Sequence, residues 1–261
     1  MITKSNHIPA LLLSTVAAFS LPLTVNAAGG GFALDAAGND VADIASLQRG
    51  ARNFVNYCAG CHSAKYIRFS KLQETLHLSE EQIQENLMFA AKKVNETMTV
   101  AMPASDAARW FGQAPPDLTL VARSRGTAWV YTFLKSFYLD EQAMTGTNNL
   151  VLPNASMPHV LWELQGLQSA TFKTSTNADT GEETGHFGDP AYFDSLTQEA
   201  EGSLSPEEYD QFVRDIVNFL DWAGTPEQLE RRTLGIWVLL FLLVFLIFAY
   251  LLKVEIWKDV K

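Results

Sequence analysis

Hydrophobic residues recur every three or four positions in several stretches of the chain, which is the spacing of a helix that buries one face. The first such stretch begins at Asp43, the second predicts a helix over about 127–139, and the third begins at Ser205 and is closed by Gly224. Their apolar faces are Ile44, Leu47, Ala51, Phe54, Val55 and Cys58; Trp129, Val130, Phe133, Leu134 and Phe137; and Tyr209, Phe212, Val213, Ile216, Val217 and Leu220.

Capping residues and prolines mark further boundaries. Ser79 with Gln82, and Ser205 with Glu208, have the spacing of a capping box, which predicts helix starts near 80 and 206. Residues 114–118, Ala-Pro-Pro-Asp-Leu, predict an extended corner, because proline and the residue before it disfavour a helix. We find no convincing run of alternating strands, so the soluble part is expected to be mainly α-helical.

A C-terminal segment is apolar throughout. Residues 234–252 carry no charge, and as a helix they are about 28 Å long, close to the hydrocarbon thickness of a bilayer. A buried core helix of that length should show polar positions, so we predict a transmembrane span. Its ends carry basic and aromatic residues of the kind found at membrane interfaces: Arg231, Arg232, Trp237, Tyr250, Lys253 and Trp257.

The N-terminus has the three parts of a bacterial secretory signal, which we assign to residues 1–27. Lys4 is followed by a short apolar run over 8–23 and by Val-Asn-Ala, a small-residue cleavage site. A membrane anchor is the alternative, but the run is short for a span. We therefore expect residues 28–224 to form a periplasmic domain and residues 225–261 to be an inner-membrane anchor with a short cytoplasmic tail.

The net charge of −10, from 29 acidic and 19 basic side chains, excludes nucleic acid as an expected partner. Residues 140–168 are rich in turn formers, and residues 169–203 are polar, which predicts a long surface loop. The acidic stretch 179–210 is either a solvated loop or a docking surface for a basic redox partner. Its acids are Asp179, Glu182, Glu183, Asp189, Asp194, Glu199, Glu201, Glu207, Glu208 and Asp210.

The candidate chemistry lies in Cys58-Ala59-Gly60-Cys61-His62. Two thiols three residues apart, with a histidine directly after the second, form the pattern of covalent c-type haem attachment. On one turn both sulfurs reach the two vinyl groups of one porphyrin, and His62 lies under the iron as its proximal ligand. The sequence has no further cysteine for a zinc site and no βαβ pattern for a thioredoxin-like dithiol. We therefore expect one haem c attached through Cys58 and Cys61.

The sixth ligand is less well determined by the residues alone. A haem with one histidine ligand keeps an open distal side in catalysis and gas binding, or takes a second ligand in electron transfer, where a thioether raises the potential. Met102 and Met157 both precede a proline, which suits a ligand-bearing extended loop, and sequence physics does not separate them. The other candidates are Met88, Met98, Met144, His77, His159 and His186. We interpret Met88 and Met98 as core or surface residues.

Several blocks of the chain resemble the cytochrome c1 family of the cytochrome bc1 complex, the ubiquinol–cytochrome c oxidoreductase, and especially its proteobacterial members. The CxxCH pattern is shared by all c-type cytochromes, but the other blocks in this order are specific. They are residues 56–65, 114–119, 122–123, 129–138, 146–149, 157–166, 202–204 and 250–258. The resemblance implies a class I cytochrome c-like haem domain, mainly α, with a long loop insertion and one C-terminal transmembrane helix.

Carried over position by position, Met157 matches the axial thioether ligand of this family and stands opposite His62 at the iron. The Met-Pro pair is followed by His159, where mitochondrial-type members are richer in proline. His159 is therefore a competing ligand or a neighbour of the haem edge.

Three further residues match positions beside the cofactor in this family. Pro115 and Pro116 resemble the corner packed next to the haem, and Arg123 matches the arginine that pairs with a haem propionate. Arginine binds carboxylates through charge-assisted, often bidentate hydrogen bonds. A solvated surface charge is the alternative for Arg123.

The resemblance implies an electron-transfer function. One electron passes from the Rieske iron–sulfur subunit through the haem to a cytochrome c acceptor in the respiratory chain, while cytochrome b oxidises the quinol in a dimeric complex. The chain itself performs no bond chemistry and supplies ligands, a dry pocket and docking surfaces. One alternative is a membrane-tethered cytochrome c shuttle or a cytochrome subunit of another redox complex. The other is a haem enzyme or gas sensor with an open sixth position.

Overall fold

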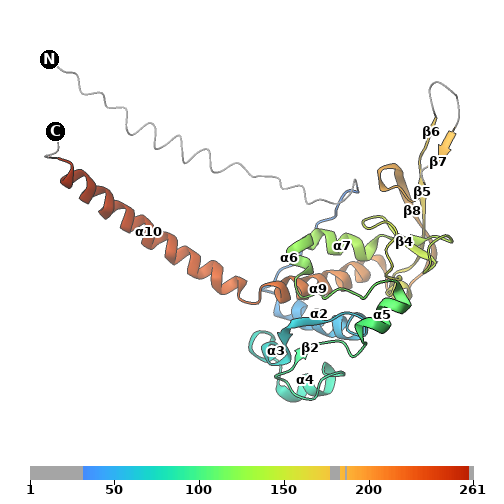
Figure 1. Ribbon diagram of the computed structural model, residues 1–261, viewed down its shortest axis with the longest axis horizontal. Coiled ribbons are helices and arrows are strands. Elements are labelled where there is room, and N and C mark those ends of the chain that lie inside the picture. Colours follow the sequence, from blue (N-terminus) through green and yellow to red (C-terminus); the bar gives the residue numbers. More distant parts are fainter. Residues whose placement is uncertain (1–31, 177–182, 186, 259–261) are drawn as a thin grey trace.

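The computed structural model describes residues 32–176, 183–185 and 187–258. The predicted signal segment 1–27 lies outside the described residues, as do His186 and part of the acidic stretch. Within these ranges the chain forms a helical domain with a β-hairpin projecting from one end and a long helix leaving it at another (Figure 1). The mainly α-helical fold is therefore confirmed.

The helices of the domain, in chain order, are α2 (Ile44–Tyr57), α3 (Phe69–Leu76), α4 (Glu80–Asn86), α5 (Ala104–Phe111), α6 (Val121–Arg125), α7 (Thr127–Lys135), α8 (Trp162–Gln165), the 3-10 turn η2 (Pro190–Tyr192) and α9 (Pro206–Gly224). The strands pair antiparallel in twos: β1 (Ala64–Arg68) with β2 (Thr97–Met98), β3 (Phe137–Leu139) with β4 (Thr147–Asn149), β5 (Gly166–Phe172) with β8 (Phe193–Glu201), and β6 (Thr174–Thr176) with β7 (Glu183–Gly185). Short helices thus surround the α2–α9 pair.

The core is built on the crossing of α2 and α9, which lie side by side in Figure 1. Both begin where the sequence predicts, because the Asp43 side chain accepts from the Ser46 N–H and Ser205 forms a full capping box with Glu208. The close approach requires a glycine at 50, since a Cβ there would lie 2.0 Å from the Asp215 carbonyl oxygen. Gly50 therefore sets how near the two helices pack.

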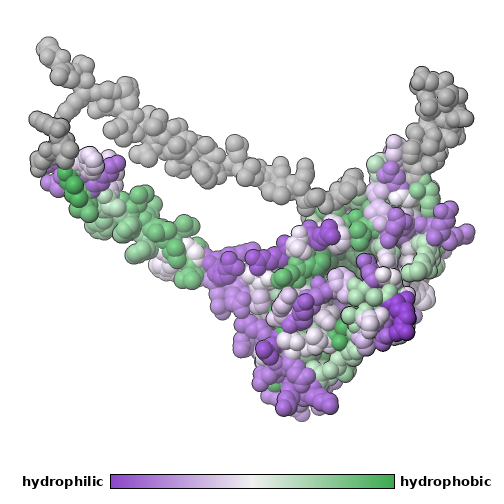
Figure 2. Space-filling model, in the orientation of Figure 1, coloured by the Kyte–Doolittle hydropathy of each residue, from purple (hydrophilic) through white to green (hydrophobic). Residues whose placement is uncertain are grey.

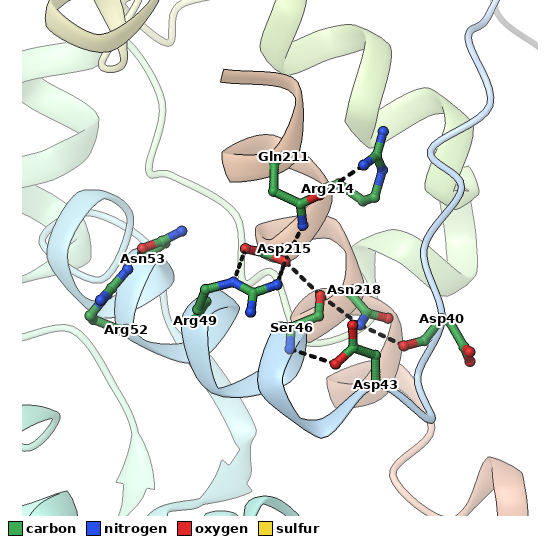
Figure 3. Close-up of polar contacts among 10 residues, drawn as sticks. All are labelled: Asp40, Asp43, Ser46, Arg49, Arg52, Asn53, Gln211, Arg214, Asp215 and Asn218. Carbon is green, nitrogen blue, oxygen red and sulfur yellow. Dashed lines mark hydrogen bonds and ion pairs between the residues drawn. The ribbon is translucent and has the colours of Figure 1, made fainter. Parts of the chain in front are cut away.

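A buried polar network joins the same two helices (Figure 3). The Asp215 carboxylate, whose side chain is 3% exposed, accepts from Arg49 Nε at 2.7 Å and Nη2 at 2.9 Å. It also accepts from Ser46 Oγ at 2.7 Å and Gln211 Nε2 at 2.8 Å. Asn218 Nδ2 donates to the same Ser46 oxygen and to the Asp40 backbone carbonyl. Because both oxygens of the buried carboxylate accept hydrogen bonds from donors on the two helices, the network fixes the rotation of α2 against α9.

The helix predicted over 127–139 ends earlier than its apolar pattern suggests. α7 stops at Lys135, and Phe137 lies in strand β3 instead. Asn149 of the paired strand β4 explains the end, because its Nδ2 donates to the Phe133 carbonyl at 2.8 Å. A side chain distant in sequence thus takes a carbonyl that the next helical turn would need.

The polar segment predicted as a long surface loop is a two-stranded hairpin, so the loop prediction is wrong for the described part of 169–203. β5 and β8 pair from Gly166–Glu201 to Phe172–Phe193, with bulges along the ladder. Most side chains of both strands are exposed or half-buried, so neither strand has the apolar alternation that would have revealed it. Aromatic contacts hold the far end instead, with Phe172 packed on Tyr138 at 5.7 Å and on Phe187 at 5.3 Å between ring centroids.

The last helix, α10 (Gln228–Ile256), is 29 residues long and follows α9 after a short break. Its apolar side chains are all exposed, and Figure 2 shows a hydrophobic surface along the helix beyond its charged first turns. It is long and apolar enough to span a membrane. The predicted C-terminal transmembrane helix therefore agrees with the structure.

Candidate functional site

An apolar cavity of ≈ 410 Å³ lies between the end of α2, the corner at 115–118, helices α6 and α7, and the loop after β4. This volume is within the usual range for ligand and cofactor sites. Its lining includes Cys58, Cys61, His62, Pro115, Pro116 and Met157 among the residues predicted from sequence, and Arg125, Trp129, Phe133 and Leu134 among the others. Six of the seven predicted site residues are therefore brought to one cavity.

The CxxCH segment reaches this cavity because the chain keeps turning after α2 ends. Cys58 is the C-cap of α2, and its carbonyl accepts from the N–H groups of Cys61 at 3.1 Å and His62 at 2.8 Å. This turn directs both sulfurs and the imidazole into the same space. Burial raises the pKa of the Cys58 thiol to about 12, so the thiol is neutral at physiological pH.

The His62 ring is oriented by the proline corner. Its Nδ1 lies 2.7 Å from the carbonyl oxygen of Pro116, which can only accept, so Nδ1 carries the proton and the Nε2 lone pair is free for a metal. Burial lowers the pKa of His62, and the hydrogen bond to Pro116 offsets part of that effect. The ring is therefore held in the neutral form and in the tautomer that ligates iron.

The corner is itself tied to the segment that follows the cysteines. Asp117 accepts from the Lys65 N–H at 2.8 Å, and the Leu118 N–H donates to the Ser63 carbonyl at 2.8 Å. The position of Pro116 relative to His62 is consequently set by hydrogen bonds that join residues 117–118 to residues 63–65.

Two asparagines of β4 support the loop that carries Met157. Asn149 Oδ1 accepts from the N–H groups of Val151 at 2.9 Å and Leu152 at 3.1 Å. Asn148 Oδ1 accepts from the Asn154 N–H at 2.7 Å. Both asparagines are buried. The sequence suggested that they are turn formers, in a block of family resemblance, whereas both lie in strand β4. The signal that could have revealed the supporting role is a pair of asparagines just before a proline-containing loop.

The other ligand candidates in the described ranges do not line the cavity. Met88 and Met98 are buried in the core, as interpreted from sequence, and Met144 and His77 are exposed. Met102 is half-buried elsewhere. His159 is buried and stacks on Phe137 with ring centroids 5.0 Å apart, and burial lowers its pKa to about 4. Of the distal-ligand candidates in the described ranges, Met157 is thus the one that lines the same cavity as the cysteine turn.

The arginine predicted to meet a propionate is not at the cavity. Both Arg123 and Arg125 are exposed, but Arg123 lies against Gly224 of α9, whereas Arg125 lines the cavity with its Cζ 5.2 Å from the Trp129 ring centroid. The two arginines are two residues apart on α6, so they point to different faces of the helix. Sequence spacing alone does not show which side of α6 faces the cavity, so Arg125 was not identified as a cavity-lining residue.

The residues present fit a haem c. They supply two thiols on one turn, a neutral imidazole with Nε2 free, a thioether, a guanidinium and a wall of aromatic and aliphatic side chains. These are the groups that covalent attachment, two-sided iron ligation and burial of a porphyrin require.

Comparison with known proteins supports the same cofactor class. The model of the Cytochrome C1 family matches residues 38–260. Cytochrome c1 of Allochromatium vinosum is 49% identical, covering 92% of this chain and 94% of that protein. The ammonia monooxygenase gamma subunit of Nitrosomonas europaea is 41% identical with the same coverage, and cytochrome c1 of Rhodospirillum rubrum is 28% identical over 84% of this chain.

Proposed function

Because the chain belongs to the cytochrome c1 family, we propose that it is the cytochrome c1 subunit of a bc1 complex and carries single electrons from a Rieske iron–sulfur protein to a cytochrome c. The observation that carries this proposal is the meeting of Cys58, Cys61, His62 and Met157 at one apolar cavity. The chain is an electron-transfer subunit and makes or breaks no substrate bond.

Each residue of the cavity has a definite part in this role. Haem c, attached to Cys58 and Cys61, supplies a one-electron iron couple. His62 Nε2 and the Met157 sulfur would ligate the iron of that haem, and the Pro116 carbonyl accepts the hydrogen bond that orients the imidazole. The thioether and the dry walls both favour the reduced state and so raise the potential.

We further propose that the domain lies on the periplasmic side of the inner membrane and that α10 crosses it once. The long apolar helix supports the span, and the signal segment predicted from sequence supports the orientation.

Copurification tests the proposed function directly. An affinity tag on this chain should bring down a cytochrome b and a Rieske protein from detergent-solubilised membranes, with quinol–cytochrome c reductase activity.

The name of the Nitrosomonas europaea relative favours a second candidate, a cytochrome subunit of a monooxygenase complex. Recovery of monooxygenase subunits without cytochrome b would support that candidate and contradict the first.

We propose that Arg125, which lines the cavity, makes the propionate contact in place of Arg123. Replacing Arg125 with glutamine should lower the haem midpoint potential by about 40 mV. The positive guanidinium repels the oxidised iron more than the reduced iron, and removal of roughly 1 kcal/mol of this repulsion makes the oxidised state easier to form. Arg123→Gln, on the same helix and exposed, is the matched control and should leave the potential unchanged. Redox titration of both variants measures the two midpoint potentials. A larger decrease in Arg123→Gln than in Arg125→Gln would show that Arg123 makes the propionate contact.

We also propose that the acidic residues of the hairpin region steer a basic cytochrome c. Asp189, the N-cap of η2, and Glu199 and Glu201 of β8 are exposed, and their neutralisation to Asn or Gln should lower the association rate several-fold and flatten its salt dependence. Glu80 and Glu81 of α4, which lies far from the hairpin in Figure 1, are the control pair. Stopped-flow rates that are independent of salt in the unmodified protein would contradict steering.

A further inference from the structure

The membrane helix is not uniform around its axis. At 3.6 residues per turn, Trp237, Phe241, Phe245 and Phe248 fall within an arc of about 80°. All four are exposed, and the rings of Phe241 and Phe245 stack along this face with centroids 6.2 Å apart. We call these four residues the aromatic ridge.

The charged residues of α10 are sorted in the same way. The two acids, Glu230 and Glu255, fall within the arc of the ridge, one at each end of the span. The three bases, Arg231, Arg232 and Lys253, fall in a separate arc turned away from it by about 130°. Glu255 has an exposed contact to Lys258 at 3.6 Å, which is worth little and leaves the carboxylate accessible.

The basic side of α10 has the properties of a lipid-facing surface. Arginine and lysine at the ends of a span are attracted to lipid phosphates, and acids are repelled by them. Tyr250 and Trp257, aromatic residues at the level of the cytoplasmic interface, lie on this same side, where an aromatic belt meets headgroups.

Apart from Trp237, an interfacial aromatic residue at one end of the span, the ridge side does not have these properties. Phe245 is roughly 16 Å along the helix from Leu234, which places it near the middle of the hydrocarbon, where interfacial anchoring cannot account for it. Acids at both ends of this side would face anionic headgroups if lipid covered it. Protein with basic residues at both membrane surfaces is the complementary neighbour.

A second copy of this helix is a poor match for the ridge. Two identical ridges would meet ring against ring and bring Glu230 against Glu230. A groove between two transmembrane helices accepts protruding rings, because helix packing sets the ridges of one surface into the grooves of another.

We propose that the aromatic ridge docks into a groove of a multispanning subunit that carries basic residues at the two membrane surfaces, while the side bearing Arg231, Arg232 and Lys253 faces lipid. The proposal rests on the proposed function, which supplies cytochrome b as such a subunit. Glu230 and Glu255 then pair with the basic residues of that subunit at the two membrane surfaces, and the phenylalanines fill the groove near the middle of the membrane.

Site-specific photocrosslinking tests which side meets protein. Benzoylphenylalanine is placed at Phe245 or Phe248, and at Leu243 or Leu246 as controls of similar depth on the other side, in the full chain in native membranes. We expect adducts with a multispanning subunit at the ridge positions, at least tenfold more than at the controls. Equal adducts from both sides, ridge adducts with lipid alone, or adducts between two copies of this chain would overturn the proposal.

Alanine substitutions on the two sides of α10 provide a second test. Phe241→Ala, Phe245→Ala and Phe248→Ala together should reduce recovery of the partner subunit at least tenfold at unchanged haem content. Leu239→Ala, Leu243→Ala and Leu246→Ala together should not, and equal losses would contradict the ridge. Ridge adducts with a multispanning subunit other than a cytochrome b would support the ridge and contradict the proposed function.

Discussion

Replacing Met157 with alanine is expected to lower the haem midpoint potential by on the order of 100 mV or more, because the axial ligand is the main determinant of a potential range of about 0.8 V. A methionine sulfur favours the reduced iron, and its loss leaves water or no ligand on that side. The reduced variant should then bind carbon monoxide rapidly, whereas the unmodified protein should bind it slowly. Redox titration and flash or stopped-flow carbon monoxide binding measure the two effects.

Met102→Ala is the matched control for this experiment. Met102 also precedes a proline, but it does not line the cavity, so its replacement should change neither the potential nor carbon monoxide binding. An unchanged spectrum and potential in Met157→Ala would remove Met157 as the ligand. Fast carbon monoxide binding by the unmodified protein would favour the alternative of an open-site haem enzyme or gas sensor.

The second large effect concerns the fold. Asp215→Ala should lower the free energy of unfolding by about 3 kcal/mol, because breaking a buried pair leaves its partners without acceptors. The carboxylate is 3% exposed, while Arg49 is 41% exposed and can reach water, which places the expected cost at the lower end of that range. Guanidinium unfolding of the detergent-solubilised chain, followed by far-ultraviolet circular dichroism, measures the change.

Asp210→Ala on the same helix is the comparison. Asp210 pairs with Lys135 at 2.7 Å, but its side chain is 39% exposed, so its loss should cost less than about 1 kcal/mol. Equal costs for the two substitutions would contradict the view that the Asp215 network joins α2 to α9.

The sequence was sufficient where local rules decide the structure. The starts of α2, α4 and α9 follow from capping residues, and the apolar faces of α2 and α9 follow from helical spacing. The apolar C-terminal segment and the CxxCH turn are likewise local patterns. None of these predictions depended on contacts between distant residues.

The sequence was insufficient where distant residues or helix phase decide. α7 ends because Asn149 takes the Phe133 carbonyl, a contact that no window around Lys135 contains. The side chains of the β5–β8 hairpin are mostly exposed or half-buried, and its sequence gave no alternating signal. Arg123 and Arg125 could be distinguished only once the rotation of α6 was known. The supporting roles of Asn148 and Asn149 also depend on tertiary contacts.

The most direct test of the central claim is acidified-acetone extraction of the purified chain, read together with its pyridine haemochrome spectrum. We expect the pigment to stay with the polypeptide through Cys58 and Cys61, and one haem per chain with the spectrum of a haem whose two vinyl groups are saturated. A pigment that dissolves in the acetone, or a chain that carries none, would contradict covalent haem attachment and the electron-transfer role with it.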